Sequence, residues 1–126
     1  MGLDMYLHKR KFKDKDNYEE LVYWRKANAV RAFFERTLPN FESNGTTRVR
    51  KENLEELVDL CQRVLANHDL APKLLPTQEG FFFGGTDYDE WYFKDLKSTI
   101  ENVQPVIDSY KDIIDDGYKI EYTEWW

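Results

Sequence analysis

The two ends of the 126-residue chain carry the pattern that most constrains its fold, because both alternate apolar and polar side chains. The stretch LDMYLHKRKF occupies residues 3–12, and YKIEYTEWW occupies residues 118–126. Alternation with a period of two is typical of a half-buried β-strand. Helical patterns fill the chain between these ends, so we expect the terminal strands to pair in one small antiparallel sheet. The lysines of residues 9–13 could then lie across from Glu121 and Glu124.

Two helices are predicted in the first part of the chain. From Tyr18 to Leu38, apolar residues recur at steps of three or four, and Pro39 ends the pattern. The stretch KENLEELVDLCQRVLAN at residues 51–67 carries an apolar stripe that includes Cys61, which we interpret as a small core residue. Residues 39–48, between these helices, are rich in Asn, Ser, Gly and Thr and predict a flexible loop.

A third and longer helix is predicted in the C-terminal part of the chain. Apolar residues follow each other at steps of three and four from Phe93 to Ile114, which gives one continuous apolar seam. Pro105 lies inside this seam. Because proline lacks a backbone donor and crowds the preceding turn, it must kink this helix or split it in two.

Both ends of the third helix carry capping signals. Asp87 followed by Glu90 resembles an N-terminal cap, with Thr86 as a second candidate, and Gly117 suits a left-handed cap at the other end. Together these patterns predict one domain, residues 1–126, of the α+β class. Three main helices, the last one kinked or broken, would pack on a small antiparallel sheet of the N- and C-terminal strands.

Composition narrows the setting in which the protein works. Hydrophobic residues make up 41% of the chain and aromatic residues 16%, enough for one core despite 33% charged residues. The apolar runs are far shorter than the roughly 20 residues of a membrane span, and the N-terminus lacks a basic-then-apolar signal pattern. A single cysteine excludes an internal disulfide and fits a reducing compartment. We therefore expect a cytoplasmic protein without membrane contact.

Negative charge is concentrated in the C-terminal part of the chain. The whole chain has a net charge of −6, and residues 77–126 hold twelve acidic against four basic side chains. This distribution argues against direct binding of nucleic acid, whose phosphates are bound mainly by Lys and Arg. The basic run at residues 8–11 is the exception. We interpret it as a solvated edge strand, with a phosphate-contacting patch as the alternative.

The stretch GFFFGGTDYDEWYF at residues 80–93 places ring area beside negative charge and leaves two interpretations open. Gly80–Phe83 fits a short buried strand, the third of the sheet, at the centre of the core. The alternative is a ligand pocket, in which glycines let a ligand approach the backbone. Asp87, Asp89 and Glu90 would repel a phosphate group there, and the spacing of a calcium loop is absent.

Acidic residues continue along the predicted third helix, and we expect them on its exposed side. They are Asp95, Glu101, Asp108, Asp112, Asp115 and Asp116. Such a face is usually only solvated; alternatively, Asp108, Asp112 and Asp115 would complement the basic groove of a partner. Trp125 and Trp126 either pack back onto the helices or form an exposed patch that binds a partner.

Trp24, Arg25 and Asn28 are further binding candidates, because the predicted helix places them close together on its surface. They could grip a ligand or a partner, or they could support the fold. No serine stands in a G-x-S-x-G context, no phosphate-binding loop is present, and His8 and His68 are too far apart for a typical zinc site. We expect no metal and no cofactor.

Segments along nearly the whole chain resemble a family of small bacteriophage and prophage proteins. In order, they are MGLDMYL, YWRKAN, ENLEELVDLCQRVL, LLPTQEGFFFGGTDYDEWYFKDLKSTIE and the tail that ends in Trp. The chain departs from its relatives at Arg50, where they tend to have serine, and at Glu124-Trp125-Trp126, where they tend to have polar residues before a final Trp. The family is uncharacterised, so the resemblance carries over no catalytic residue. It implies an accessory protein made in an infected bacterial cell, a class that frequently blocks a host enzyme or defence system, as anti-CRISPR proteins do.

Two classes of function follow from these observations. The first is a non-enzymatic phage protein that binds a host protein, such as a defence component, and inhibits it. The second is a small-ligand binder that sequesters a nucleotide with Arg25, Asn28 and residues 80–92. An enzyme comes third, because Asp87 and Glu90 around a metal would be the only chemistry available.

Overall fold

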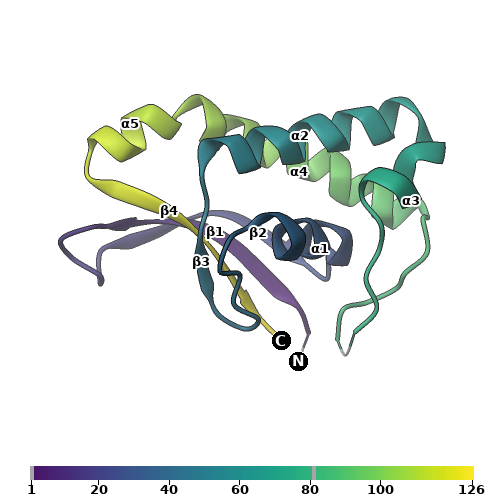
Figure 1. Ribbon diagram of the computed structural model, residues 1–126, viewed down its shortest axis with the longest axis horizontal. Coiled ribbons are helices and arrows are strands. Elements are labelled where there is room, and N and C mark those ends of the chain that lie inside the picture. Colours follow the sequence, from purple (N-terminus) through teal and green to yellow (C-terminus); the bar gives the residue numbers. More distant parts are fainter. Residues whose placement is uncertain (1, 81) are drawn as a thin grey trace.

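The computed structural model describes residues 2–80 and 82–126, and it has an α+β architecture. Four strands form one antiparallel sheet in the order β2-β1-β4-β3, and the helices lie on one face of that sheet (Figure 1). The strands are β1 (Asp4–Lys11), β2 (Tyr18–Arg25), β3 (Thr46–Arg48) and β4 (Tyr118–Trp125). The helices are α1 (Asn28–Thr37), α2 (Lys51–Ala66), the short 3-10 helix η1 (His68–Leu70), α3 (Ala71–Leu74), α4 (Glu90–Asp108) and α5 (Tyr110–Asp115).

The predicted pairing of the two chain ends is confirmed. Strands β1 and β4 lie side by side and antiparallel, with Asp4 opposite Trp125. The predicted partners of the two glutamates are wrong, because the register places Glu121 opposite His8 and Glu124 opposite Met5. Burial acts to raise the pKa of Glu121, but hydrogen bonds from Arg10 and His8 outweigh it and hold that pKa below its ordinary value.

The predicted helix over residues 18–38 is wrong in its first half. Residues 18–25 form β2, an edge strand that pairs with β1 through a hairpin, and the helix begins only at Asn28. Val22 and Trp24 point into the core at the spacing of a strand. The steps of three and four seen in the sequence joined residues of two different elements. The end of the helix before Pro39 is confirmed.

The sheet differs from the prediction at both of its edges. Strand β1 lies between β2 and β4, so the basic run at residues 8–11 is not an edge strand. The edge beside β4 is β3, three residues within the stretch 39–48 that was predicted as a loop. The predicted third strand is wrong too: Gly80, Phe82 and Phe83 are not in a strand, and Phe81 lies outside the described residues. Phe83 is buried in the core, whereas Phe82 is 42% exposed.

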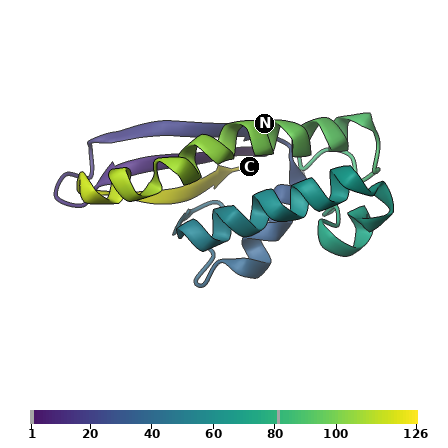
Figure 2. The ribbon, with the colours of Figure 1, turned by 90° about the horizontal axis from the view of Figure 1, so that it is seen from above.

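The second predicted helix is confirmed as α2, which runs beside α4 (Figure 2). Its apolar stripe is buried, and Cys61 lies fully inside the core. Burial raises the pKa of the Cys61 thiol to about 12, so this cysteine stays protonated and unreactive at neutral pH. The interpretation of Cys61 as a core residue is therefore confirmed.

The third predicted helix is split in two, but the break lies after Asp108 and not at Pro105. Helix α4 continues past Pro105 to Asp108, and α5 begins after Ser109, so the described residues hold five α-helices instead of the predicted three. The N-terminal cap is Asp89, whose carboxylate accepts a hydrogen bond from the Tyr92 N–H at 3.1 Å, and not Asp87 or Thr86. Gly117 takes the expected left-handed conformation, with φ of +87°.

A buried ion pair at the centre of the molecule fixes the segments around the core. Arg31 of α1 and Glu124 of β4 are almost completely buried, and the Arg31 Nε and Nη2 groups donate to the Glu124 carboxylate. The carboxylate also accepts from the Asn44 N–H, the Tyr122 hydroxyl and the Trp126 indole N–H. The other Arg31 donors bond to Glu35, Gln78 and Ser43, so every hydrogen-bonding position of both groups is used within the protein.

The helices of the described part of the chain are neither long nor apolar enough for any of them to cross a membrane.

Candidate functional site

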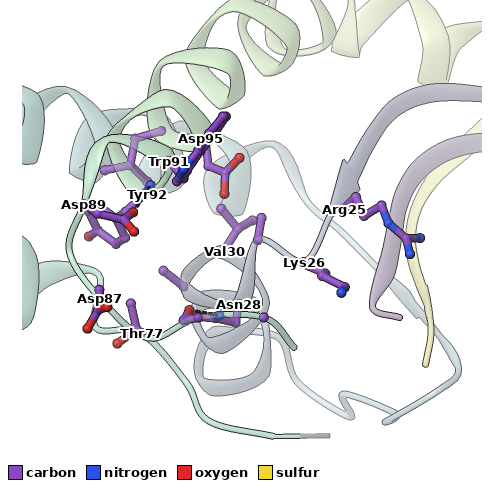
Figure 3. Close-up of a pocket in the computed structure, with 15 residues that line it drawn as sticks. Arg25, Lys26, Asn28, Val30, Thr77, Asp87, Asp89, Trp91, Tyr92 and Asp95 are labelled. Carbon is purple, nitrogen blue, oxygen red and sulfur yellow. Dashed lines mark hydrogen bonds between the residues drawn. The ribbon is translucent and has the colours of Figure 1, made fainter. Parts of the chain in front are cut away.

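A pocket of about 390 Å³ opens between the N-terminal half of α4, the junction of β2 and α1, and the irregular segment that precedes α4 (Figure 3). We call it the Asp95 pocket. It is lined by Arg25, Lys26, Ala27, Asn28, Ala29, Val30, Thr77, Gly84, Gly85, Asp87, Asp89, Trp91, Tyr92, Asp95 and Leu96. Four residues proposed from the sequence meet here: Arg25, Asn28, Asp87 and Asp89.

The β2–α1 junction forms one wall of the pocket in a strained conformation. Lys26 has a φ of +55°, the left-handed region that costs a side chain roughly 1–3 kcal/mol. Two backbone hydrogen bonds hold it there: its N–H donates to the Leu3 carbonyl, and its carbonyl accepts from the Asn28 N–H. Gly84, also left-handed, lies beside it, and a Cβ at Gly84 would come within 3.2 Å of the Lys26 Cβ.

The predicted cluster of Trp24, Arg25 and Asn28 on one helix surface is wrong, because these residues belong to β2 and α1. Trp24 is buried, and its indole N–H donates to the Thr99 hydroxyl at 2.8 Å. Arg25 ends β2 and donates to the carboxylate of Asp4 at 2.8 Å.

Asn28 ties helix α1 to the segment before α4. Its amide nitrogen donates to the carbonyls of Phe83 and Gly85, and its amide oxygen accepts from the Gln78 N–H. Both donors of the amide are therefore used within the protein, which favours the supporting role for Asn28 over contact with a ligand.

Three carboxylates line the α4 side of the pocket: Asp87, Asp89 and Asp95 (Figure 3). Asp95 is partly buried, and desolvation, followed by the negative charge of Asp89, raises its pKa to about 6. Its carboxylate makes no hydrogen bond or ion pair with any described residue. At neutral pH the pocket therefore holds a negative charge that has lost part of its hydration without gaining a partner.

The sequence interpretation missed Asp95 as a pocket residue and placed it with the exposed acids. Helical spacing could have indicated that Asp95 faces inward. It follows Tyr92 by three positions and precedes Thr99 by four, and both of these residues are buried.

Trp91 stands at the rim of the pocket and was also not singled out from the sequence. It is 64% exposed, an unusual position for so large an apolar side chain. The Lys94 ammonium lies 4.7 Å from the centre of its ring, so the ring already accepts a cation on its surface. An exposed tryptophan beside a pocket is typical of a binding surface.

Positive charge lies on the other side of the pocket. The Arg25 guanidinium is engaged by Asp4, whereas the exposed Lys26 ammonium forms no ion pair within the described chain. Figure 3 shows both basic side chains apart from the carboxylates of Asp89 and Asp95. The pocket thus separates its charges instead of pairing them.

The remaining acidic candidates lie away from the Asp95 pocket. Asp108, Asp112 and Asp115 belong to the end of α4 and to α5, at the opposite end of the molecule from the start of α4 (Figure 1). All three are exposed or partly exposed, and two are partnered on their own helix turns: Asp108 accepts from Gln104, and Asp115 pairs with Lys111 at 2.8 Å. Glu90 is exposed in the first turn of α4 and does not line the pocket.

The two terminal tryptophans have different surroundings. Trp125 is 69% exposed. Trp126 packs back onto the molecule, with its ring 5.2 Å from the ring of Phe83 and 5.8 Å from the Arg31 guanidinium. The sequence offered packing or exposure for the pair, and each tryptophan adopts one of them.

The pocket is lined by charged, aromatic, polar and small apolar side chains. Among the described residues, no group of three His, Cys, Asp or Glu side chains could hold a metal ion. The pocket lining contains no cysteine, histidine or serine. It offers a ligand charged side chains, the exposed ring of Trp91 and the partly desolvated carboxylate of Asp95.

Comparison of the chain with protein-family models, with curated proteins and with solved structures gave no match.

Proposed function

We propose that the protein is a non-enzymatic binding protein and that the Asp95 pocket receives a basic side chain of a partner protein. One observation carries this proposal: the partly buried Asp95 carboxylate faces an open cavity without any partner in the described chain. A guanidinium or ammonium group entering the pocket would supply the missing counter-charge. The binding energy would come from an interaction that the free protein leaves unmade.

The surroundings of Asp95 suit a cation in two further ways. The carboxylates of Asp87 and Asp89 add negative potential inside a concave site, which attracts positive groups. The exposed ring of Trp91 can lie against a guanidinium, since Arg and Trp form favourable stacking and cation–π contacts. Trp and Arg are also the residues most often found at the energetic centres of protein interfaces.

The hypothesis of a nucleotide ligand has less support from the same geometry. A phosphate near Gly84 and Gly85 would meet the three carboxylates, and the Asn28 amide has no donor left to offer. We therefore expect a panel of nucleotides to leave the melting temperature unchanged, whereas a ligand at 100 times its Kd would add about 2.7 kcal/mol.

The resemblance to bacteriophage proteins supplies the biological setting of this proposal. In that setting the partner is a host protein of the infected bacterium, such as a component of a defence system, and occupying its basic residue inhibits it. A protein that contacts nucleic acid is a suitable partner, because its function depends on exposed Lys and Arg side chains.

Affinity capture from bacterial lysate tests the proposal when variants are compared in parallel. We expect the wild type and the control Glu101→Gln, a charge change on the exposed side of the same helix, to retain the same companion protein. Asp95→Asn should lower its retention at least tenfold, because truncating a desolvated charge pair costs about 2–5 kcal/mol. Trp91→Ala should also lower it.

A triple variant separates the Asp95 pocket from the competing acidic face. Asp108→Asn, Asp112→Asn and Asp115→Asn together should leave capture nearly unchanged. Loss of the companion in the triple variant, with full retention by Asp95→Asn, would overturn the proposal and assign binding to the α5 end. Thermal unfolding of each variant shows whether its fold is intact.

A further inference from the structure

The Asp95 pocket offers a positive group as well as a negative one, and this narrows what it can bind. We infer that it takes a dipolar segment, in which a basic side chain reaches Asp95 while a neighbouring carboxylate reaches Lys26. This inference rests on the proposed function and specifies the chemistry of its ligand.

The first supporting observation is the backbone of Lys26. A glycine would adopt its φ of +55° without strain, and two of the other non-glycine residues with positive φ are asparagines, which tolerate this region. A lysine here is strained, and the stem of its side chain lies beside Gly84 and Gly2. The residue is nevertheless exposed, so its ammonium group remains available at the pocket. The backbone hydrogen bonds to Leu3 and from Asn28 fix the position from which this side chain projects.

The second observation is that the Lys26 ammonium and the Asp95 carboxylate do not neutralise each other. Both line the same pocket, yet neither forms an ion pair with any described residue (Figure 3). Arg25, next to Lys26, is different because its guanidinium is held by Asp4. Lys26 is thus the basic group of this pocket that is ready to bind an anion.

These two observations define the ligand by its charges. A group that is only cationic would satisfy Asp95 and approach Lys26 unfavourably, whereas a group that is only anionic would meet Asp87, Asp89 and Asp95. A segment that carries both charges matches both sides. An Arg or Lys beside an Asp or Glu in a protein has this chemistry, and so has a free basic amino acid with its own carboxylate.

A matched pair of peptides tests the inference. Acetyl-Arg-Asp-amide and acetyl-Arg-Asn-amide differ only in the carboxylate, and the reversed order, Asp-Arg against Asn-Arg, covers the other geometry. Binding is followed by NMR of the ¹⁵N-labelled protein, through the indole N–H of Trp91 and the amide of Asp95. Agmatine, which carries only cationic groups, and free arginine are titrated alongside.

We expect the wild type to bind the aspartate peptide, in at least one order, about twofold to fivefold more tightly than its asparagine partner, the effect of one exposed ion pair. Lys26→Gly should abolish this difference and still bind agmatine. The control Glu101→Gln should preserve it. Free arginine binding as tightly as the aspartate peptide would support the dipolar chemistry and identify a small amino acid as its source.

The outcomes separate this inference from the proposed function. If agmatine and all the peptides bind the wild type equally, or if Lys26→Gly keeps the preference for aspartate, the role of Lys26 is refuted while the cation site stands. If neither agmatine nor any peptide shifts the Trp91 and Asp95 signals, the proposed function itself fails.

Discussion

Two charged centres of this molecule, one at Arg31 of α1 and one at Lys26 of the junction before it, differ in whether their charges are partnered. At Arg31 and Glu124, both charges are buried and every hydrogen-bonding group is used. At Lys26 and Asp95, the charges line an open pocket and find no partner in the described chain. Charged groups that make all their hydrogen bonds within the protein stabilise the fold, whereas charged groups without a partner remain able to bind a ligand.

The largest effect expected from this comparison is at Glu124. Glu124→Gln should lower the free energy of unfolding by about 3 kcal/mol, because the buried Arg31 guanidinium then keeps only the partly exposed Glu35 carboxylate as a counter-charge. Urea denaturation followed by circular dichroism measures the change. A loss below about 1 kcal/mol would mean that the Arg31–Glu124 centre is not what holds β4, α1 and the Asn44 segment together.

The opposite sign is expected at Asp95. Asp95→Asn should raise the free energy of unfolding at pH 7 by about 1–2 kcal/mol, less than the full pKa shift implies because part of the carboxyl remains in water.

This gain at Asp95 should depend on pH in a defined direction. A carboxyl group whose pKa is raised to about 6 binds a proton more readily in the folded state than in the unfolded state. Stability of the wild type relative to Asp95→Asn should therefore fall as the pH rises from about 4 to about 6, and then stay level. Urea denaturation at a series of pH values measures this difference, and a gain independent of pH would contradict a desolvated carboxylate.

The smallest effect is expected at Lys26. Lys26→Gly should raise the free energy of unfolding by about 1 kcal/mol or less, because relief of the left-handed strain is partly offset by the larger entropy of glycine in the unfolded chain. Melting temperature is a sufficient measure, with Glu101→Gln as a control for loss of a surface charge. A clear drop in melting temperature would show that the Lys26 side chain supports the fold.

The elements predicted correctly from the sequence are those whose pattern is uninterrupted. Helix α2 has a continuous stripe from Leu54 to Val64, and β4 alternates apolar and polar residues from Tyr118 to Thr123. The division of the third helix was predicted correctly, but its position was not: the break lies at Ser109, four residues after Pro105. The pairing of β1 with β4 was predicted because the sequence showed one clear strand at each end of the chain.

The elements predicted wrongly depend on contacts that local pattern does not contain. Residues 18–25 fit a helical spacing only when combined with α1, and the hairpin with β1 decides in favour of a strand. Strand β3 has three residues, too few for any periodicity, and exists because β4 offers it an edge. Tertiary pairing overrode the local signal in both cases.

The Asp95 pocket could be predicted from the sequence only in part. Arg25, Asn28, Asp87 and Asp89 were among the candidates, but nothing local shows that Asn28 uses its amide within the fold or that Asp95 lacks a partner. Likewise, Arg31 and Glu124 are 93 positions apart, so no local sequence pattern indicates that they form an ion pair. Whether a charged side chain has a partner is decided only when the chain is folded.

The most direct test of the central claim is an NMR titration of the Asp95 carboxyl carbon, without and with agmatine. We predict a pKa near 6 in the free protein and a clear fall in that pKa when agmatine is added, because a bound cation favours the ionised form. A pKa in the ordinary range of an exposed aspartate, unchanged by agmatine, would contradict the account: Asp95 would then be a solvated surface charge and its pocket no receptor for a cation.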